Sequence, residues 1–264
     1  MIGFMGGGNM AEALIKGIAQ SSKLIAQSEI LVSEPREERR KYLEQTYGVK
    51  ITPDNKEVAS SCNIIILAIK PQNMDTVLDE IADLITDEKT VVSIAAGITF
   101  SYLQMRLKTK KLIRVMPNTP ALIQEGMSVM SLCECISDKD IMIVRDIFMS
   151  IGRLLILPEK YMNAVTALSG SGPAFIAYFI EAMIEGSEKM GLNKGDATAL
   201  AIQTLLGTAR LLDTGMSPEK LREMVTSPGG TTEAGLKIFE ERGFIDIVKD
   251  AIETAVERAK ELGR

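Results

Sequence analysis

Small residues at positions 6, 8 and 11 have the spacing of a turn that can hold a dinucleotide pyrophosphate. In the pattern G-x-G-x-x-G/A, Gly6 permits a tight turn, Gly8 leaves room for the phosphates, and Ala11 lets helix and strand pack closely. Residues 2–5 are apolar like a buried strand, and residues 11–19 have helical periodicity, so an anion would meet the N–H groups and dipole of a helix start. The turn therefore predicts a dinucleotide site rather than an ordinary glycine-rich connection, with expected contacts at Gly6, Gly7, Gly8, Asn9 and Met10.

Residues 33–36 follow the second predicted strand, where such a site would contact the adenine ribose. Glu34 would accept hydrogen bonds from a ribose 2′-OH and favour NADH, whereas Ser33 and Arg36 would hold a 2′-phosphate and favour NADPH. The alternative is that these residues are only the solvated start of a helix. Asn55, in the next turn, is a further candidate for contact with adenosine, although asparagine is also common in turns for its own reasons.

Three further segments lie at the carboxyl ends of predicted strands, the edge at which ligands bind open α/β sheets. Lys70 lies at the end of a buried strand and could face phosphate or ribose. Ala95 and Ala96 end the next strand and leave room for a flat ring, and Asn118 ends the one after. Each segment could be an ordinary turn, but three on consecutive strands indicate a pocket. Its expected cofactor contacts are Ala68, Ile69, Lys70, Pro71, Ala95 and Ala96.

Two segments in the last part of the chain combine glycines with a predicted helix start. They are T-A-L-S-G-S-G-P-A at 166–174 and S-P-G-G-T-T-E at 227–233. A helix start preceded by glycines attracts a carboxylate by the same physics as the first turn, and the alternative is routine capping by Ser or Thr. Two adjacent glycines at 229 and 230 are more than a cap requires, which favours a functional role.

The chain contains no histidine. Nucleophilic catalysis by Ser–His or Cys–His pairs, zinc sites with histidine ligands, and dehydrogenases that use imidazole as their acid or base are therefore excluded. Any catalysis must therefore proceed without an imidazole, the side chain whose ordinary pKa lies closest to neutral pH.

The overall charge and the cysteines exclude further classes of protein. A net charge of −5 provides no basic surplus for nucleic acid, and charged residues interrupt the apolar stretches, so we expect neither a membrane span nor a signal peptide. The three cysteines, Cys62, Cys133 and Cys135, have no framework spacing, which predicts a cytoplasmic protein. Cys133 and Cys135 could share a strand face and suit a metal, but no further soft ligand is near, so we expect two small buried side chains and no metal.

The elements that must position these residues fall into two groups. Up to residue 158, short β-branched runs alternate with amphipathic helices, which predicts a Rossmann-type doubly wound parallel α/β sheet. Strand candidates are 2–5, 30–33, 48–51, 62–69, 90–95, 112–116, 127–133 and 153–157. Residues 159–264 contain only helix candidates, at 173–190, 197–212, from 217, and 244–262. We therefore expect a dinucleotide-binding domain at 1–158 and an all-α dimerisation domain at 159–264.

The dimerisation role follows from the helix predicted at 197–212, which carries no charge from residue 197 to residue 209. A helix that is apolar on most sides must be buried on most sides, and a small helical domain offers few layers for that. A partner subunit is the economical solution, so we expect helices that interleave in a dimer.

Taken together, these segments resemble pyrroline-5-carboxylate reductase over essentially the whole chain. The resemblance is carried by the glycine turn at 6–11, A-I-K-P at 68–71 and N-T-P at 118–120. It is carried more specifically by L-S-G-S-G-P-A at 168–174 and V-T-S-P-G-G-T-T at 225–232.

The resemblance implies hydride transfer from NADPH or NADH to C5 of 1-pyrroline-5-carboxylate, giving L-proline. The substrate would sit between the cofactor and the helical domain, with its carboxylate around Gly230, Thr231 and Thr232 and with Thr232 near the imine nitrogen as the catalytic residue. Asn118 and Ser171 complete the expected substrate contacts. The resemblance also implies a homodimer with interleaved C-terminal helices that can assemble into a larger ring such as a decamer. Glu34 is acidic where many relatives have a small polar residue, which leaves the cofactor preference open.

Two other classes of protein compete with this interpretation. β-Hydroxyacid dehydrogenases resemble the chain in its first turn and use a Lys followed four residues later by Asn, a spacing that Lys189 and Asn193 have; the alternative is that Lys189 lies on a solvated helix end. A cofactor-sensing regulator would keep the fold but lose the substrate segment, whereas Gly230, Thr231 and Thr232 are all present. The S-P-G-G-T-T segment at 227–232 favours the imine reductase, and the absence of histidine is compatible with it, because solvent can protonate a cyclic imine.

Overall fold

The computed structural model describes residues 1–21 and 29–263, which form two compact units. The sheet unit comprises Met1–Ser171 and Thr254–Arg264, and the helical unit comprises Gly172–Glu253. The sheet unit thus extends past the boundary that we expected after residue 158. The physical reason is that Met162 and Val165 are buried against Val129 of the sheet.

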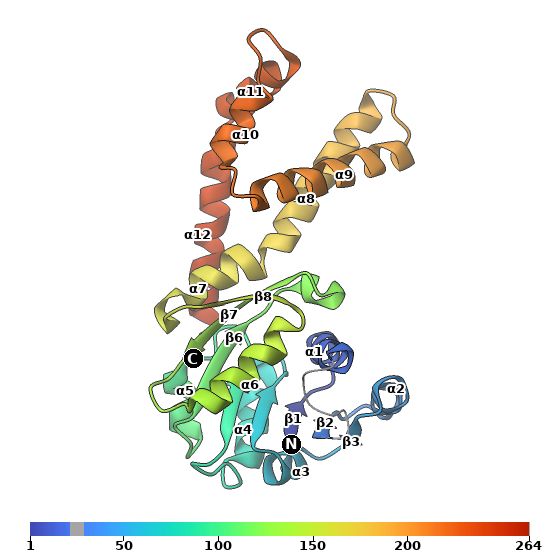
Figure 1. Ribbon diagram of the computed structural model, residues 1–264. Coiled ribbons are helices and arrows are strands. Elements are labelled where there is room, and N and C mark those ends of the chain that lie inside the picture. Colours follow the sequence, from blue (N-terminus) through green and yellow to red (C-terminus); the bar gives the residue numbers. More distant parts are fainter. Residues whose placement is uncertain (22–28, 264) are drawn as a thin grey trace. The chain divides into compact units, whose positions relative to one another are not determined.

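The sheet has eight strands in the order β3-β2-β1-β4-β5-β6-β7-β8 (Figure 1). The strands β1 to β6 pair in parallel, as predicted, but β7 pairs antiparallel with β6, and β8 follows β7 in parallel. The expectation of a wholly parallel sheet was therefore wrong for its last two strands. The strands are Ile2–Met5 (β1), Ile30–Ser33 (β2), Lys50–Thr52 (β3), Ile64–Leu67 (β4), Thr90–Ser93 (β5), Leu112–Met116 (β6), Gly126–Leu132 (β7) and Gly152–Ile156 (β8).

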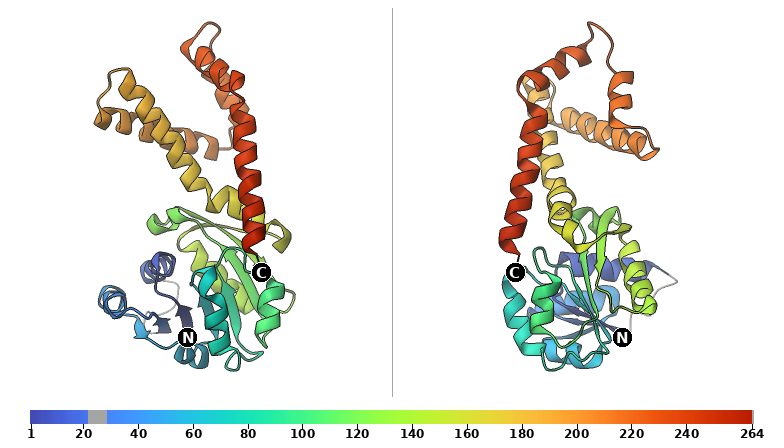
Figure 2. Two further views of the ribbon diagram at one scale, coloured as in Figure 1. Left: turned by 180° about the vertical axis from the view of Figure 1, so that it is seen from behind. Right: turned by 90° about the vertical axis from the view of Figure 1, so that its left-hand side faces the viewer.

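Helices cover both faces of the sheet, and alternate strand residues supply the two cores (Figures 1 and 2). Phe4 and Ile66 pack with residues of α1 and α6, whereas Met5 and Leu67 pack with residues of α3, α4 and α5. Two-sided burial explains why the strands are apolar runs without polar alternation. The helices are Asn9–Gln20 (α1), Glu37–Tyr47 (α2), Asn55–Ser61 (α3), Met74–Ile81 (α4), Phe100–Arg106 (α5) and Asp138–Met149 (α6).

The helical unit contains Gly172–Lys189 (α8), Lys194–Asp213 (α9), Pro218–Met224 (α10), Thr231–Glu241 (α11) and most of Phe244–Leu262 (α12). A small cluster of rings, Phe179, Phe239 and Phe244, links α8, α11 and α12. No residue of α8 is buried in the single chain, and Ile176, Tyr178, Leu200 and Ile202 are exposed. Such apolar surface is typical of an interaction site.

The segment at 166–174 does not contain the helix start that we expected after its glycines. Met162–Val165 (α7) continues into a π-helical turn at Thr166–Gly170 and then into α8, with the Ser171 N–H donating to the Thr166 carbonyl at 2.9 Å. Because the helix is continuous, Ser171 does not precede a free helix start. A carboxylate site of the helix-terminus type is therefore ruled out at this segment, although a π-helical turn is itself frequent at functional sites.

One helix among the described residues, Glu159–Lys189, is long and apolar enough to cross a membrane by length and composition, with a mean hydropathy of 1.3 in its best window. Only 6% of that window is buried in the single chain.

Candidate cofactor and substrate sites

The glycine turn joins β1 to α1 in the predicted place. Gly6 has φ +94°, a conformation that favours glycine, and its N–H donates to the Ser33 carbonyl at 2.8 Å. Gly8 is the N-cap of α1 and makes no side-chain capping bond. The first N–H groups of a helix have no partner within the helix, so those after Gly8 are available to an anion.

A polar cluster that sequence reasoning missed braces this turn from outside. Arg39 donates from Nε to the Gly7 carbonyl at 2.6 Å and from Nη2 to the Gly8 carbonyl at 3.4 Å, and it pairs with Glu12. Tyr42 and Tyr47 also donate to Glu12. Burial raises the pKa of Glu12, but the hydrogen bonds from Arg39 and the two tyrosines outweigh it and hold that pKa below its ordinary value. No motif links Glu12 to Arg39, because the pair forms only when α1 and α2 pack together.

Glu34 lies directly beneath the turn. Its Oε2 accepts the Gly7 N–H at 3.0 Å, and its Oε1 accepts the Arg36 N–H at 3.2 Å and the Arg36 Nε at 2.7 Å. The carboxyl is buried, which raises its pKa, but the bonds from Arg36 and Gly7 lower the pKa below the ordinary value. Glu34 is therefore a buried carboxylate rather than the solvated helix residue of the alternative interpretation.

Next to the turn is a pocket of about 620 Å³. Four predicted cofactor contacts (Gly6, Ser33, Asn55 and Ile69) line it, together with Asn73, Thr76 and Glu80, which we did not predict. Ser33 Oγ lies 2.6 Å from Asn55 Oδ1, and Asn55 Nδ2 donates to Glu80 at 2.8 Å. The sequence signal for the missed residues is that they follow the predicted segment 68–71 closely, in the 3-10 turn Pro71–Asn73 and in α4, which begins at Met74.

Backbone hydrogen bonds bring the predicted strand ends to one edge. The Ala68 N–H donates to the Met5 carbonyl at 2.8 Å, and the Ile94 N–H donates to the Leu67 carbonyl at 3.3 Å. The segments 68–71 and 95–96 therefore follow neighbouring strands beside the glycine turn. Lys70 is exposed and Ala95 is buried.

Asn118 joins two segments that the sequence placed far apart. Its Nδ2 donates to Ser169 Oγ at 3.2 Å, and its Oδ1 accepts the Met127 N–H at 2.8 Å. The N-T-P segment thus lies against the π-helical turn, within the sheet unit. Ser171, a predicted substrate contact, ends this turn, and its hydroxyl lies 3.4 Å from the Thr166 carbonyl.

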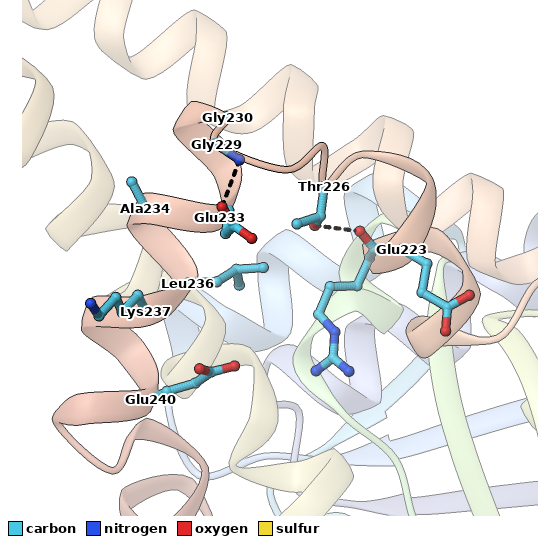
Figure 3. A pocket seen from close by; sticks show the side chains of 10 residues that line it. Glu223, Thr226, Gly229, Gly230, Glu233, Ala234, Leu236, Lys237 and Glu240 are labelled. Atoms are coloured by element: carbon cyan, nitrogen blue, oxygen red, sulfur yellow. Dashed lines mark hydrogen bonds between the residues drawn. The ribbon is translucent and has the colours of Figure 1, made fainter.

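The other predicted substrate residues begin α11 in the helical unit. Gly230 is the N-cap of α11 and makes no side-chain capping bond, while the Gly229 N–H is held by Glu233 at 2.7 Å. Figure 3 shows Glu233 folded back to that N–H, beside a pocket of about 900 Å³ that Gly229 and Gly230 also line. Thr231 and Thr232 do not line this pocket, because it follows the helix face of Glu233 and Lys237. The N–H groups of the first turn remain available to an anion.

Two alternatives from the sequence find no support. Lys189 ends α8, whereas Asn193 is the N-cap of α9 and binds Asp196, so the pair does not share a helix. Cys133 and Cys135 lie beyond the end of β7; Cys135 is exposed, so the expectation of two buried thiols was wrong. Within the described part of the chain, no group of three or more His, Cys, Asp or Glu could hold a metal ion.

Comparisons with known proteins agree with these features. Residues 159–262 match the family model for pyrroline-5-carboxylate reductase dimerisation, and residues 1–97 match that for coenzyme F420-dependent NADP oxidoreductases. Pyrroline-5-carboxylate reductase of Synechocystis is 40% identical over 264 residues, covering 100% of this chain and 98% of the relative. The Methanosarcina acetivorans enzyme of the same name is 40% identical over 265 residues, with the same coverage.

Solved structures give the same result. The pyrroline-5-carboxylate reductase structure from Coxiella burnetii has a TM-score of 0.90 at 34% identity, covering 100% of this chain and 98% of that one. The Plasmodium falciparum pyrroline carboxylate reductase, solved with NADP bound, has a TM-score of 0.89 at 32% identity with the same coverage. The sheet with its glycine turn, the helical unit and full-length identity near 40% to curated members together show that the chain belongs to the pyrroline-5-carboxylate reductase family.

Proposed function

We propose that this chain reduces 1-pyrroline-5-carboxylate to L-proline, with the cofactor on the start of α1 and the substrate carboxylate on the start of α11. The observation that carries the substrate half is the glycine N-cap at Gly230, which leaves the first N–H groups of α11 without a side-chain partner. A carboxylate at that position is stabilised by these N–H groups and by the helix dipole.

The described residues fit a nicotinamide dinucleotide. A Cβ built on Gly8 meets no heavy atom within 4 Å, so the space in front of the helix start is open to phosphates. The pocket of about 620 Å³ beside the turn can take the adenosine half. When bound, the reduced nicotinamide supplies the hydride. Ala95 and Ala96, at the end of β5, are proposed to lie against its ring, and Lys70 to face phosphate or ribose.

The protein's own contribution to this reaction is mainly positioning. A protonated cyclic imine accepts hydride at carbon without a strong acid from the enzyme, which suits a chain that has no histidine. Holding the reacting atoms in line can supply a large share of the rate acceleration. We propose that Gly230 and Thr231 hold the carboxylate and that the Thr232 hydroxyl hydrogen-bonds the ring nitrogen. Asn118 and Ser171 are proposed as further substrate contacts.

Initial rates test the reaction directly. We expect turnover of 1-pyrroline-5-carboxylate with NADPH or NADH, and none of 3-hydroxyisobutyrate. Turnover of the hydroxy acid alone would favour the β-hydroxyacid dehydrogenase class. Cofactor binding without turnover, and without any effect of proline, would favour a regulator.

Thr232→Val is expected to lower kcat/KM for the imine while leaving the Kd of the cofactor unchanged. Loss of one neutral hydrogen bond costs about 0.5–1.5 kcal/mol, or roughly a 2- to 13-fold loss of rate. The measurement combines steady-state kinetics with a fluorescence titration of the reduced cofactor. Thr232→Ser keeps the hydroxyl and should retain most of the activity. Equal rates for the valine variant and the parent would remove Thr232 from the mechanism.

We also propose that the chain forms a homodimer with interleaved C-terminal helices, able to assemble into a ring such as a decamer, in the cytoplasm. Support comes from the dimerisation family model over residues 159–262 and from the unburied apolar residues of α8 and α9. The free cysteines agree with a reducing compartment.

Ile202→Glu on α9 is expected to convert the assembly to monomer. Ile202 is 52% exposed in the single chain, and an interface that covers it would have to bury the new charge. Size-exclusion chromatography with light scattering measures the mass. Met142→Glu is the matched control, since Met142 is 58% exposed on α6 of the sheet unit. An unchanged mass for the Ile202 variant would place the interface elsewhere.

A further inference from the structure

We infer that Glu34 makes this enzyme prefer NADH to NADPH, because its carboxylate and its hold on Arg36 close the position that a 2′-phosphate would need. The inference rests on the proposed function only in that a nicotinamide dinucleotide binds at the glycine turn. The residues after β2 lie at the point where the adenine ribose of such a cofactor binds.

The first candidate ligand for a 2′-phosphate, Ser33, is already engaged. Its Oγ lies 2.6 Å from Asn55 Oδ1 and 3.3 Å from the Phe4 carbonyl, and the residue is buried. A hydroxyl has one proton to donate, and both neighbours are acceptors. Ser33 therefore directs its proton into the protein rather than toward a ligand.

The Glu34 carboxylate is fixed in place and is not free to turn away. Its side chain is 5% exposed, and its two oxygens accept three hydrogen bonds, from the Gly7 N–H and from the N–H and Nε of Arg36. A carboxylate has about four acceptor positions, so one remains. Ser33 and Pro35, on either side of Glu34, line the pocket of about 620 Å³, whereas the buried Glu34 is not itself among the lining residues. The remaining position suits the proton of a 2′-hydroxyl.

Two of the nearby arginines are already paired with carboxylates. Arg36 donates its Nε to Glu34 at 2.7 Å, and Arg39 is paired with Glu12. Arg40 donates to the carbonyls of Glu34 and Pro35, at 2.7 Å each, without a carboxylate partner. Arg40 and Lys56, an exposed residue that lines the pocket, are thus cations that a 2′-phosphate could still recruit, and each needs its own variant in the test.

Charge then decides between the two cofactors. A phosphate monoester carries about −1.5 to −2 at pH 7 and would come close to an ionised carboxylate whose own counter-ion is already used. A 2′-hydroxyl instead donates one hydrogen bond to that carboxylate. Repulsion on one side and a charge-assisted hydrogen bond on the other favour NADH.

The binding experiment isolates the 2′-phosphate from the rest of the reaction. Calorimetric titration of the full-length protein with 5′-AMP and with adenosine 2′,5′-bisphosphate compares two ligands that differ only in that group. We expect 5′-AMP to bind at least tenfold more tightly, and fluorescence titration to give NADH a Kd at least tenfold below that of NADPH. Equal or tighter binding of the 2′-phosphorylated ligands would overturn the inferred preference for NADH but not the proposed cofactor site. Failure of both dinucleotides to bind would overturn the proposed cofactor site, and this inference with it.

Variants then assign the preference to Glu34. Glu34→Gln keeps the shape and an acceptor for the Gly7 N–H but removes the charge, and Glu34→Ser also releases Arg36. We expect the ratio of NADPH to NADH affinity to rise at least tenfold in the serine variant and by less in the glutamine variant. Adding Arg36→Ala to Glu34→Ser should remove most of the gain, whereas adding Arg40→Ala or Lys56→Ala should not. A ratio that stays within twofold of the parent in both Glu34 variants, with thermal unfolding showing them folded, would refute the role of Glu34.

Discussion

Gly8→Val is expected to leave the protein folded and to weaken NADH and NADPH binding at least 100-fold. Gly8 has φ −71° and ψ −175°, an extended conformation that any residue adopts, and a Cβ there meets no heavy atom within 4 Å. The open space is the space that the cofactor phosphates would occupy, so the new side chain collides with the ligand and not with the protein. The free energy of unfolding should fall by only about 1 kcal/mol, through a poorer helix cap. Fluorescence titration and thermal unfolding measure the two effects separately.

Gly7→Ala provides the contrast within the same turn. A Cβ at Gly7 would lie 2.8 Å from Leu43 Cδ1 and 3.2 Å from Glu34 Cβ, inside the protein. That variant should lose about 1–3 kcal/mol of stability through overpacking, whatever its effect on binding. If the Gly8 variant instead bound both cofactors within threefold of the parent, the pyrophosphate would not cross Gly8.

Glu159→Ala is expected to cost about 2–3 kcal/mol of unfolding free energy, because it leaves the buried Arg114 guanidinium without its carboxylate, while Glu159 itself is 31% exposed. Arg114 of β6 has a side chain that is 6% exposed, and its Nη1 lies 2.6 Å from Glu159 Oε1. The same oxygen accepts the Phe100 N–H at 2.7 Å, so the substitution leaves two donors without a partner. Denaturant unfolding at one fixed protein concentration measures the loss, because subunit association also contributes to stability.

Two controls separate the buried charge from general effects. Arg114→Met combined with Glu159→Leu removes both charges and should recover most of the stability. Lys41→Ala, which breaks an exposed pair with Glu37, should change stability by less than about 1 kcal/mol. A loss at Glu159 no larger than that at Lys41 would show that water replaces the carboxylate.

The sequence was sufficient to predict most of the sheet but not the direction of its last strands. Runs such as I-I-I-L at 64–67 are buried on both faces and predict strands whatever their direction. The reversal at β7 follows from the connection before it, which contains only the short helix Thr119–Ile123. A parallel crossover needs a dozen residues or more. The shortness of the connection between the strands predicted at 112–116 and 127–133 could therefore have been used to predict an antiparallel pair.

The residues of the candidate site were likewise predictable only in part. The glycine turn and the strand-end segments were predictable, because each depends on local geometry and on the common edge of parallel strands. The contacts that brace them were not. Glu12 meets Arg39, and Asn118 meets Ser169, only through packing between distant segments. The π-helical turn was mistaken for a break because Gly170 and Gly172 suggest one, whereas the Thr166 carbonyl accepts the Ser171 N–H and keeps the helix continuous.

The glycine N-caps at Gly8 and Gly230 make the stability of the folded protein depend on whether ligands are bound at these two helix starts. A side-chain cap is also missing from α2 and α4, whereas side chains cap five other helices, from Asp54, Thr99, Ser137, Asn193 and Ser217. At Gly8 and Gly230 no side chain does so, and a bound pyrophosphate or carboxylate would complete the helix instead. A ligand at 100 times its Kd adds about 2.7 kcal/mol to the folded state. The resistance of this enzyme to unfolding and proteolysis in the cell would then follow the supply of its own metabolites.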